Sequence, residues 1–324
     1  ESMRKILLLV FLFFCTEFLA ISENKVAIIY SAGGLGDEGY NDLAHKALNK
    51  AKFDLGIDFD YYEPIDPVKE TERQLMTYSD SKSYDLIITV GFLSKSSIEK
   101  AAKEYPNQKY AIVDEIVFDS KNITSITFNV EEESFLAGAV AALMTKTDKV
   151  AFIGGTEAPL IARYKAGFEQ GAKYVKPDVE VLVSYIGGYN SFNDPKKAEQ
   201  ITNELIRENT DVFYHAAGAS NRGIVSSAKK YGKYVIEVDS YSDWQNEEVV
   251  IASAVKNIDV AVYDIIKKLT DNTLENKTYI YGAKEERIGI VIKAEEKIGI
   301  KKLKIIKEIT DLLKSGVIKT DFSG

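Results

Sequence analysis

Short apolar runs rich in β-branched residues alternate along this chain with segments of helical periodicity. The predicted strands are Val26–Tyr30, Phe59–Tyr62, Leu86–Val90, Tyr110–Val113, Ile123–Phe128, Val150–Ile153, Val179–Ile186, Val212–Ala216, Tyr234–Val238 and Val250–Val255. The predicted helices include Leu43–Leu55, Thr71–Thr77, Ser94–Glu104, Glu132–Thr145, Arg163–Tyr174, Pro195–Glu208 and Asn221–Tyr231. Apolar strands separated by helices indicate an α/β fold with parallel sheets and right-handed crossovers.

The strand and helix pattern repeats in two halves. Each half opens with a strand and a glycine-containing loop, at Tyr30-Ser-Ala-Gly-Gly34 and at Ile153-Gly-Gly-Thr156. Each half also contains a strand that ends in aspartate, Asp114 in the first and Asp239 in the second. This repetition predicts two α/β lobes with a cleft between them, a preferred place for small ligands.

The chain is expected to cross between the lobes more than once. The candidate crossings are Asn129–Glu131, Lys256–Ile258 and a third segment near Gly282–Gly289. The predicted N-terminal lobe is therefore 25–129 plus 256–282, and the predicted C-terminal lobe is 130–255 plus 283–324.

The glycine-rich loop after the first strand, Ser31–Asp42, lies where open α/β sheets hold their ligands. Its glycines permit a tight turn, and Asp37, Tyr40 and Asn41 are expected to project into the cleft. The loop is neither G-x-G-x-x-G nor a Walker loop, so nothing in it calls for a phosphate. The alternative is an ordinary turn in which Asp37 or Asn41 only caps the next helix.

The N-terminus has the pattern of an export signal over residues 1–20. Met3-Arg-Lys5 is followed by the apolar run Ile6–Cys15, which is too short to span a bilayer. Cys15, the only cysteine, is a candidate for lipid attachment, although the bulky Phe14 before it departs from the lipoprotein pattern. The expected location is extracytoplasmic, either membrane-associated as a lipoprotein or periplasmic.

Composition excludes several classes of function. The 324 residues include 41 basic and 49 acidic side chains, a net charge of −8 without a basic stripe, which argues against nucleic-acid binding. His45 and His215 are the only histidines, and no catalytic or metal-ligand motif is present. We therefore expect neither an enzyme nor a metal or cofactor.

Several strings resemble, in order, those of the basic membrane protein family of bacterial lipoproteins. Asp37-Glu-Gly-Tyr-Asn-Asp42 is similar to "DDKSFND", and Glu132-Glu-Ser-Phe-Leu-Ala-Gly138 is similar to "EGSFLAG". Further matching strings are Phe152–Gly155, Tyr164–Tyr174, Ala216–Gly218, Val235–Asp239 and Ser253–Lys256. The resemblance extends from about Lys25 to about Gly289.

This resemblance implies the type I periplasmic binding fold, with two doubly wound parallel-sheet lobes joined by three crossovers. It also implies a substrate-binding protein that delivers nucleosides, purines among them, to the membrane permease of an ABC transporter. The ring that stacks on the base would be Tyr40 in the first lobe and Tyr214 in the second. The remaining ligand-binding positions would be Asn41, Asp37, Asp114, Gly218, Asp239 and Lys256. The family's aspartate near the first strand end is missing, because this chain has Tyr30-Ser-Ala32 there.

The residue types suit such a ligand. Two aromatic faces stack a base without reading its edges, and ionised carboxylates accept hydrogen bonds from sugar hydroxyls. The alternatives are structural: Tyr214 as a core strand residue, Asp114 and Asp239 as turn caps, and Lys256 as a surface lysine. Strand alternation places Tyr214 opposite Phe213 but does not say which face is the cleft.

Two other functions remain open at this stage. One is a receptor for another flat hydroxylated ring such as riboflavin. The other is a nucleoside-sensing regulator on the same fold, which the export signal and the lack of a helix-turn-helix segment before Lys25 disfavour.

Overall fold

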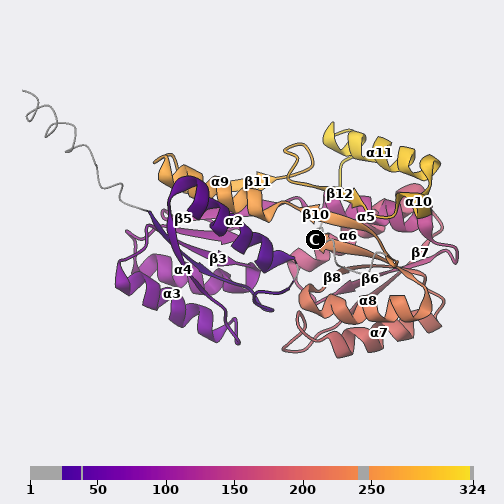
Figure 1. The fold of residues 1–324 in the computed structure, drawn as a ribbon, viewed down its shortest axis with the longest axis horizontal. Helices are drawn as coiled ribbons and strands as arrows, with labels where there is room; N and C mark the ends of the chain where they lie inside the picture. The colour runs from indigo at the N-terminus through magenta and orange to yellow at the C-terminus, as the bar shows by residue number, and fades with distance from the viewer. Residues whose placement is uncertain (1–23, 38, 240–247, 322–324) are drawn as a thin grey trace, which may run out of the picture.

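The structure is a computed structural model that describes residues 24–37, 39–239 and 248–321. Two α/β lobes lie side by side along the long axis of the molecule (Figure 1). The predicted export signal and Cys15 lie outside the described residues.

The first lobe contains a sheet of six parallel strands in the order β11-β5-β4-β3-β1-β2. These strands are β1 (Lys25–Ile29), β2 (Asp58–Tyr62), β3 (Leu86–Val90), β4 (Tyr110–Val113), β5 (Ile123–Phe128) and β11 (Thr278–Tyr281). The helices of this lobe are α2 (Tyr40–Leu55), α3 (Lys69–Ser81), α4 (Lys95–Glu104) and α9 (Ile258–Thr270), with the 3-10 turn η1 (Phe92–Ser94).

The second lobe repeats this plan in the order β12-β10-β9-β8-β6-β7, with only β12 antiparallel to its neighbour. Its strands are β6 (Lys149–Gly154), β7 (Glu180–Tyr185), β8 (Val212–Ala216), β9 (Tyr234–Asp239), β10 (Val250–Lys256) and β12 (Ile288–Ile292). Its helices are α5 (Val130–Met144), α6 (Pro159–Val175), α7 (Pro195–Arg207), α8 (Asn221–Tyr231), α10 (Glu295–Ile298) and α11 (Ile300–Lys314), with the 3-10 turn η2 (Gly218–Ser220).

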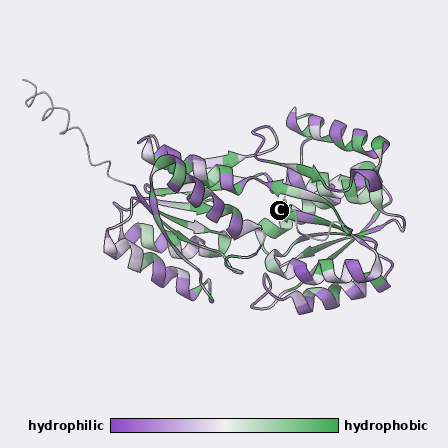
Figure 2. Cartoon of the chain, in the orientation of Figure 1, coloured by the Kyte–Doolittle hydropathy of each residue, from purple (hydrophilic) through white to green (hydrophobic). Residues whose placement is uncertain are grey.

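Each predicted strand is present, with ends that differ by at most one residue. The fold class is confirmed, because both sheets are doubly wound and covered by helices on both faces. In β1, Val26 and Ile28 face one core while Ala27 and Ile29 face the other, so the strand is apolar on both sides. Figure 2 accordingly shows hydrophobic strands inside and hydrophilic outer faces on the helices.

The chain passes between the two sheets three times. Strand β5 of the first sheet leads into α5, and β10 of the second sheet leads into α9. The third passage joins β11 to β12 through residues 282–287. Because three segments connect the lobes at one side, the opposite side of the cleft is its mouth.

Helices α5 and α6 cross with their backbones in contact. A Cβ atom at Gly138 would overlap the Phe168 carbonyl oxygen, and one at Gly171 would overlap the Phe135 carbonyl oxygen. On the next turn, a Cβ atom at Gly167 would overlap the carbonyl oxygen of Glu131. The two helices therefore form one rigid unit of the second lobe.

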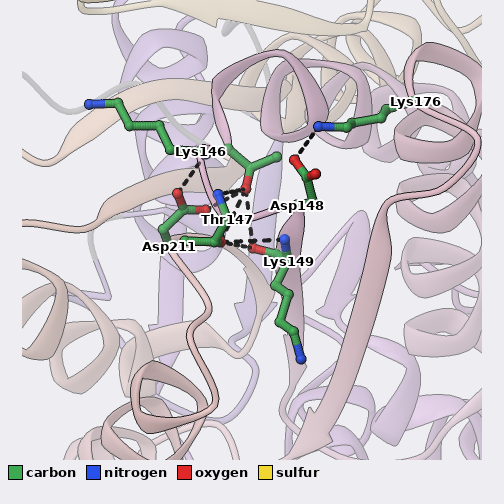
Figure 3. Close-up of polar contacts among 7 residues, drawn as sticks. Lys146, Thr147, Asp148, Lys149, Lys176 and Asp211 are labelled. Atoms are coloured by element: carbon green, nitrogen blue, oxygen red, sulfur yellow. Dashed lines mark hydrogen bonds and ion pairs between the residues drawn. The ribbon is translucent and has the colours of Figure 1, made fainter.

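A polar cluster fixes the far end of α5 to the second sheet (Figure 3). The Asp211 carboxylate accepts hydrogen bonds from Thr145 Oγ1 at 2.6 Å and from the Lys146 backbone N–H at 2.7 Å. Thr147 Oγ1 donates to the Lys149 carbonyl at 3.4 Å, and Lys176 pairs with Asp148. This end of the lobe lies at the N-terminal ends of β6 and β8, away from the cleft.

Candidate functional site

A cavity lies between the lobes where the C-terminal ends of both sheets meet, with about 600 Å³ of space including its open mouth. Its lining comes from loops and helix starts of both lobes. The lining residues are Ser31, Ala32, Asp37, Tyr40, Gly91, Phe92, Leu93, Asp114, Leu160, Ile161, Tyr164, Phe192, Ala216, Ala217, Gly218, Val238, Asp239 and Lys256. Six of the eight predicted ligand-binding residues are among them: Asp37, Tyr40, Asp114, Gly218, Asp239 and Lys256.

Lys256 forms the charged centre of this cavity. Its ammonium lies 2.6 Å from Asp114 Oδ2 of the first lobe and 3.2 Å from Asp239 Oδ1 of the second. It also donates to the Tyr164 hydroxyl at 2.8 Å. The side chain is 1% exposed, so it is not a snorkelling surface lysine. One residue at a crossing thus bridges both lobes.

The neighbouring carboxylates keep the Lys256 ammonium protonated. Burial lowers the pKa of Lys256, but the Asp114 and Asp239 carboxylates outweigh this effect and raise the pKa above its usual value. The ammonium also lies 4.8 Å from the centre of the Tyr40 ring, within cation–π range. The site therefore contains a permanent ion-pair network and no free cation among its lining residues.

Asp114 and Asp239 occupy equivalent places, directly after β4 and at the end of β9. Both have a left-handed backbone, with φ of 64° and 67°, a conformation that aspartate tolerates better than most residues. This geometry turns both carboxylates toward Lys256. Asp114 Oδ1 is buried and makes no hydrogen bond within the described residues, so an acceptor remains available.

The first-lobe loop presents Tyr40 at the start of α2. The Tyr40 hydroxyl is buried and has no hydrogen-bond partner within the described part of the chain. Burial is the main cause that raises the pKa of Tyr40 well above its usual value, with the negative charge of Asp114 second. A neutral phenol that lacks a partner is a polar group for a ligand to satisfy.

Asp37 and Asn41 organise this loop. Asp37 accepts bonds from the backbone N–H groups of Gly39 at 3.0 Å and Asn41 at 2.8 Å, so it serves the unpaired donors where α2 begins. Burial raises the pKa of Asp37 to about 6. Asn41 is fully buried, accepts from the Ser31 N–H at 2.9 Å and donates to Asp37 at 2.9 Å. Asn41 therefore shapes the loop from beneath and does not line the cavity.

The expectation that Tyr214 presents a ring to the cleft is wrong. Tyr214 is fully buried, stacks on Phe168 with ring centres 5.3 Å apart, and bonds through its hydroxyl to Ser134 at 3.1 Å. Its strand ends at Ala216, and it is Ala216 that reaches the cavity. The core alternative applies, because position 214 faces α5 and α6.

Among the described residues, the second lobe presents two aromatic rings to the cavity: Tyr164 of α6, and Phe192 in the loop between β7 and α7. A Cβ atom at Gly155 would overlap the Phe192 ring, and one at Gly218 would lie 3.0 Å from the Phe192 carbonyl oxygen. Ser220 Oγ fixes the loop by donating to the Ser191 carbonyl at 3.0 Å. The predicted residue Gly218 thus supports the ring.

The sequence reasoning also missed Phe92 and Tyr164 as lining residues. Phe92 follows β3 and meets Phe192 across the cleft with ring centres 6.3 Å apart and planes at 72°. Loop aromatics such as Phe92 and Phe192 show no periodicity. The available signal was their position after a predicted strand, next to Gly91 and after Gly187-Gly188.

The cavity is polarised. Asp114 follows β4, and Asp239 and Lys256 end β9 and β10, strands on the side of the sheets where the crossings lie. Phe92 and Phe192 follow β3 and β7, which lie farther from the crossings. Ala32, after β1, and Ala216, at the end of β8, lie on this side as well. A ligand with a hydroxyl-bearing end and a flat ring matches this arrangement.

Neither histidine lines this cavity. His215 bonds through Nε2 to Glu237 at 2.8 Å inside the second lobe, and His45 bonds to the Tyr30 hydroxyl at 2.7 Å in the first. Across residues 24–37, 39–239 and 248–321, no group of three or more His, Cys, Asp or Glu side chains is arranged to hold a metal ion. No helix of the same residues is long and apolar enough to cross a bilayer.

Two sheet-based lobes around a cleft with three connections are the fold of the periplasmic type of solute-binding protein. A solved solute-binding protein of an ABC transporter system from Aeropyrum pernix superposes with a TM-score of 0.84 at 26% identity, covering 92% of this chain and 94% of that one. The chain belongs to the Bmp family, described as PnrA-like ABC transporter substrate-binding proteins, whose model matches residues 24–320.

Named relatives agree with this family. The chain is 32% identical over 314 residues to basic membrane protein D of Borreliella burgdorferi, covering 93% of this chain and 89% of the relative. It is 30% identical over 280 residues to the ABC transporter nucleoside-binding protein BmpA of Lactococcus lactis, covering 80% and 78%. The chain is thus an ABC transporter substrate-binding protein.

Proposed function

We propose that this protein binds nucleosides, purine nucleosides among them, in the cleft between its lobes and delivers them to a membrane permease. The observation that carries the proposal is the single cavity that joins the Lys256 ion-pair network to the Phe92 and Phe192 rings. The name of the Lactococcus relative, a nucleoside-binding protein, supports the same ligand class.

The charged end suits a ribose. Asp114 Oδ1 is an unused acceptor, and the Tyr40 hydroxyl is an unused donor and acceptor. Two neighbouring sugar hydroxyls can donate to carboxylates in short charge-assisted bonds. Asp239 and Lys256 offer the second acceptor and a donor from the other lobe. Sugar binding would therefore draw on both lobes.

The apolar end suits a purine ring. Phe192 and Tyr40 come from opposite lobes and Phe92 lies beside Phe192, so aromatic surface is available on more than one side. Base–aromatic stacking is worth about 1–3 kcal/mol per base. Leu93, Leu160 and Ile161 add apolar surface for the ring, while Ser31 and Asp37 are the polar lining residues near this end that could read the base edge.

The charge of the cavity disfavours nucleotides. Lys256 is the only cationic side chain among the lining residues, and two carboxylates already neutralise it. A phosphate would meet Asp114 and Asp239 without an arginine or a free lysine to compensate. We therefore propose uncharged nucleosides as the cargo.

The protein is proposed to bind its ligand without converting it. The lining residues that the structure describes include no histidine, cysteine or threonine. We also propose that the N-terminal lobe comprises residues 25–129 plus 256–282, and the C-terminal lobe residues 130–255 plus 283–324. An export signal over 1–20, with Cys15 as a lipid anchor, would place the protein outside the cytoplasm at the membrane surface.

Calorimetric titration of the purified protein tests this function. The probes are adenosine, inosine, guanosine, adenosine monophosphate and riboflavin. Binding of at least one nucleoside, with no binding of the monophosphate and no release of free base, is the expected result. Binding of riboflavin alone, or of none of the nucleosides, would reject the proposal.

A further inference from the structure

Tyr164 lines the charged end of the cavity and has no role in the ligand binding described so far. It lies on α6, one turn after the lining residues Leu160 and Ile161, and is 3% exposed. Its hydroxyl accepts a hydrogen bond from the Lys256 ammonium at 2.8 Å and lies 3.4 Å from Asp239 Oδ1. The hydroxyl is therefore placed between a cation and a carboxylate that line the same cavity.

The Lys256 ammonium has three N–H donors, and the protein supplies a partner for each of them. The partners are Asp114 Oδ2 at 2.6 Å, the Tyr164 hydroxyl at 2.8 Å and Asp239 Oδ1 at 3.2 Å. Lys256 can donate to a ligand only by releasing one of these partners. A free donor at this end of the cavity therefore has to come from a neutral hydroxyl.

The Tyr164 O–H group is such a donor. Because the hydroxyl oxygen accepts from Lys256, its own proton remains to be donated. The acceptor within the protein is Asp239 Oδ1 at 3.4 Å, which is longer than the usual O–H···O distance of about 2.5–3.0 Å. Burial and then the charge of Asp239 raise the pKa of Tyr164 well above its usual value, so the proton is present at neutral pH.

The pair formed by Tyr164 and Asp239 matches a hydroxyl group of a ligand. A hydroxyl can accept from the phenol and donate to the carboxylate at the same time. A ring nitrogen that only accepts would face the negative charge of Asp239 without a proton to offer it. The pair therefore favours the sugar of a nucleoside over the edge of its base.

The helix that carries Tyr164 has a rigid support. Three residues further along α6, a Cβ atom at Gly167 would overlap the carbonyl oxygen of Glu131 on α5. The neighbouring Arg163 donates to the Phe128 carbonyl at 2.9 Å, at the end of β5 in the first lobe. A donor held on a rigid element discriminates between ligand groups better than one on a mobile loop.

We propose that Tyr164 is a specificity-determining residue that, together with Asp239, binds one hydroxyl group of the ligand's sugar. The Tyr164 hydroxyl donates to the oxygen of that group, and the Asp239 carboxylate accepts a hydrogen bond from it. This inference deepens the proposed nucleoside binding and rests on it. It assigns part of the selectivity to the sugar and to a phenol that the sequence reasoning missed.

The first test uses the parent protein alone. Calorimetry compares adenosine with 2′-deoxyadenosine, 3′-deoxyadenosine and 5′-deoxyadenosine. We expect at least one deoxy analogue to bind about 10- to 100-fold more weakly than adenosine, because its missing hydroxyl leaves buried polar groups unpaired. A parent that binds all four alike would overturn the inference without any variant.

The second test assigns the contact to Tyr164. Tyr164→Phe keeps the ring and removes only the hydroxyl. The preference for the hydroxyl at one sugar position should fall at least about fivefold in this variant, while the preferences at the other two positions stay the same. The matched control is Tyr110→Phe: Tyr110 is 0% exposed and pairs with Ser79 at 2.6 Å outside the cavity lining, so all four affinities should be unchanged.

A third measurement tests the pair. Asp239→Asn should reduce the preference at the same sugar position as Tyr164→Phe, and a reduction at a different position would overturn the inference. Equal weakening of all four ligands by Tyr164→Phe would mean that the hydroxyl acts only through Lys256, and it would overturn the inference while leaving nucleoside binding in place. A parent that binds no nucleoside would reject the proposed function and this inference with it.

Discussion

Asn129 and Asn257 have almost the same backbone conformation at two different crossings between the lobes. Asn129 precedes α5 with φ −79° and ψ 67°, and Asn257 precedes α9 with φ −77° and ψ 64°. Each donates its backbone N–H to the third crossing, Asn129 to the Tyr281 carbonyl at 2.8 Å and Asn257 to the Arg287 carbonyl at 2.7 Å. The third connection is thus hydrogen-bonded to each of the other two, and the three form a single candidate hinge.

Ligand should close the lobes about this hinge, because the cavity is lined from both sides. We expect small-angle scattering to give a smaller radius of gyration with saturating adenosine than without it. The control is the Phe192→Ala variant, measured at an adenosine concentration that saturates the parent but is too low to saturate the variant. Its radius of gyration should not change. A radius of gyration that does not change at saturating adenosine would indicate a rigid pocket instead.

Replacing Lys256 by methionine should destabilise the protein by about 3–5 kcal/mol, because Asp114 and Asp239 would remain buried without their counter-ion. Nucleoside binding should be lost as well. Urea unfolding measures the first effect and calorimetry the second. Lys46→Met is the matched control: Lys46 pairs with Asp259 at 2.7 Å but is 68% exposed, so its loss should cost less than about 1 kcal/mol. Equal losses for the two variants would contradict a buried bridge.

Phe192 and Tyr214 should respond in opposite ways. Phe192→Ala is expected to weaken nucleoside binding by about 1–3 kcal/mol, the value of one stacked base, with little change in stability. Tyr214→Phe removes only the hydroxyl that bonds to Ser134, and it should cost about 0.5–1.5 kcal/mol of stability while leaving affinity unchanged. Calorimetry and urea unfolding on both variants decide this. A loss of affinity in Tyr214→Phe would place that ring back at the ligand.

Asp239→Asn should weaken the binding of ribosides far more than that of free bases. The substitution turns one acceptor oxygen into a donor and removes the charge that strengthens bonds from sugar hydroxyls. Competition titrations with adenosine and adenine provide the comparison. Equal losses for both would mean that Asp239 does not contact the sugar.

Asp37 should make stability depend on pH. Its folded pKa of about 6 is raised from 3.8, so its contribution is present below about pH 4 and lost as pH rises through about 6. This rise in the pKa of Asp37 corresponds to about 3 kcal/mol of unfolding free energy. The unfolding free energy of the parent, minus that of Asp37→Asn, should therefore fall by up to that amount between about pH 4 and pH 7. A flat difference in urea titrations would show that the bonds from Gly39 and Asn41 hold the carboxylate charged throughout.

Periodicity was sufficient to predict most of the fold, because strands such as β3 are apolar on both faces and are bounded by polar turns. It missed β11 and β12, which are only partly buried and lie next to the third crossing. It also predicted α3 only as Thr71–Thr77, because Lys69-Glu70 and Ser79-Asp-Ser81 at the two ends carry no apolar period, although Tyr78 and Ser79 are buried.

The site was predictable where side chains follow strands, as with Asp114 and Asp239. A site residue was not predictable where its place depends on which face of a strand meets the cleft. Tyr214 lies one residue from His215 on the opposite face, and neither face of β8 is the cleft, since the strand meets the cavity only at its end. Phe192 supplies the cavity-lining ring that was expected at Tyr214, and its placement depends on contacts with Gly155 and Gly218, which lie far away in the sequence.

The backbone contact between α5 and α6 has a consequence for protein engineering by recombination. Gly138 lies on α5 and faces Phe168, while Gly167 and Gly171 lie on α6 and face α5. A chimera that takes α5 from one relative and α6 from another keeps this fit only where both parents carry glycine at these positions, because a single methyl group at any of the three forces the helices apart. Because α5 begins directly after Asn129, that separation would misalign the two halves of the cleft. A breakpoint between residues 130 and 175 should therefore fail where either parent lacks one of these glycines, even if both parents bind the same ligand.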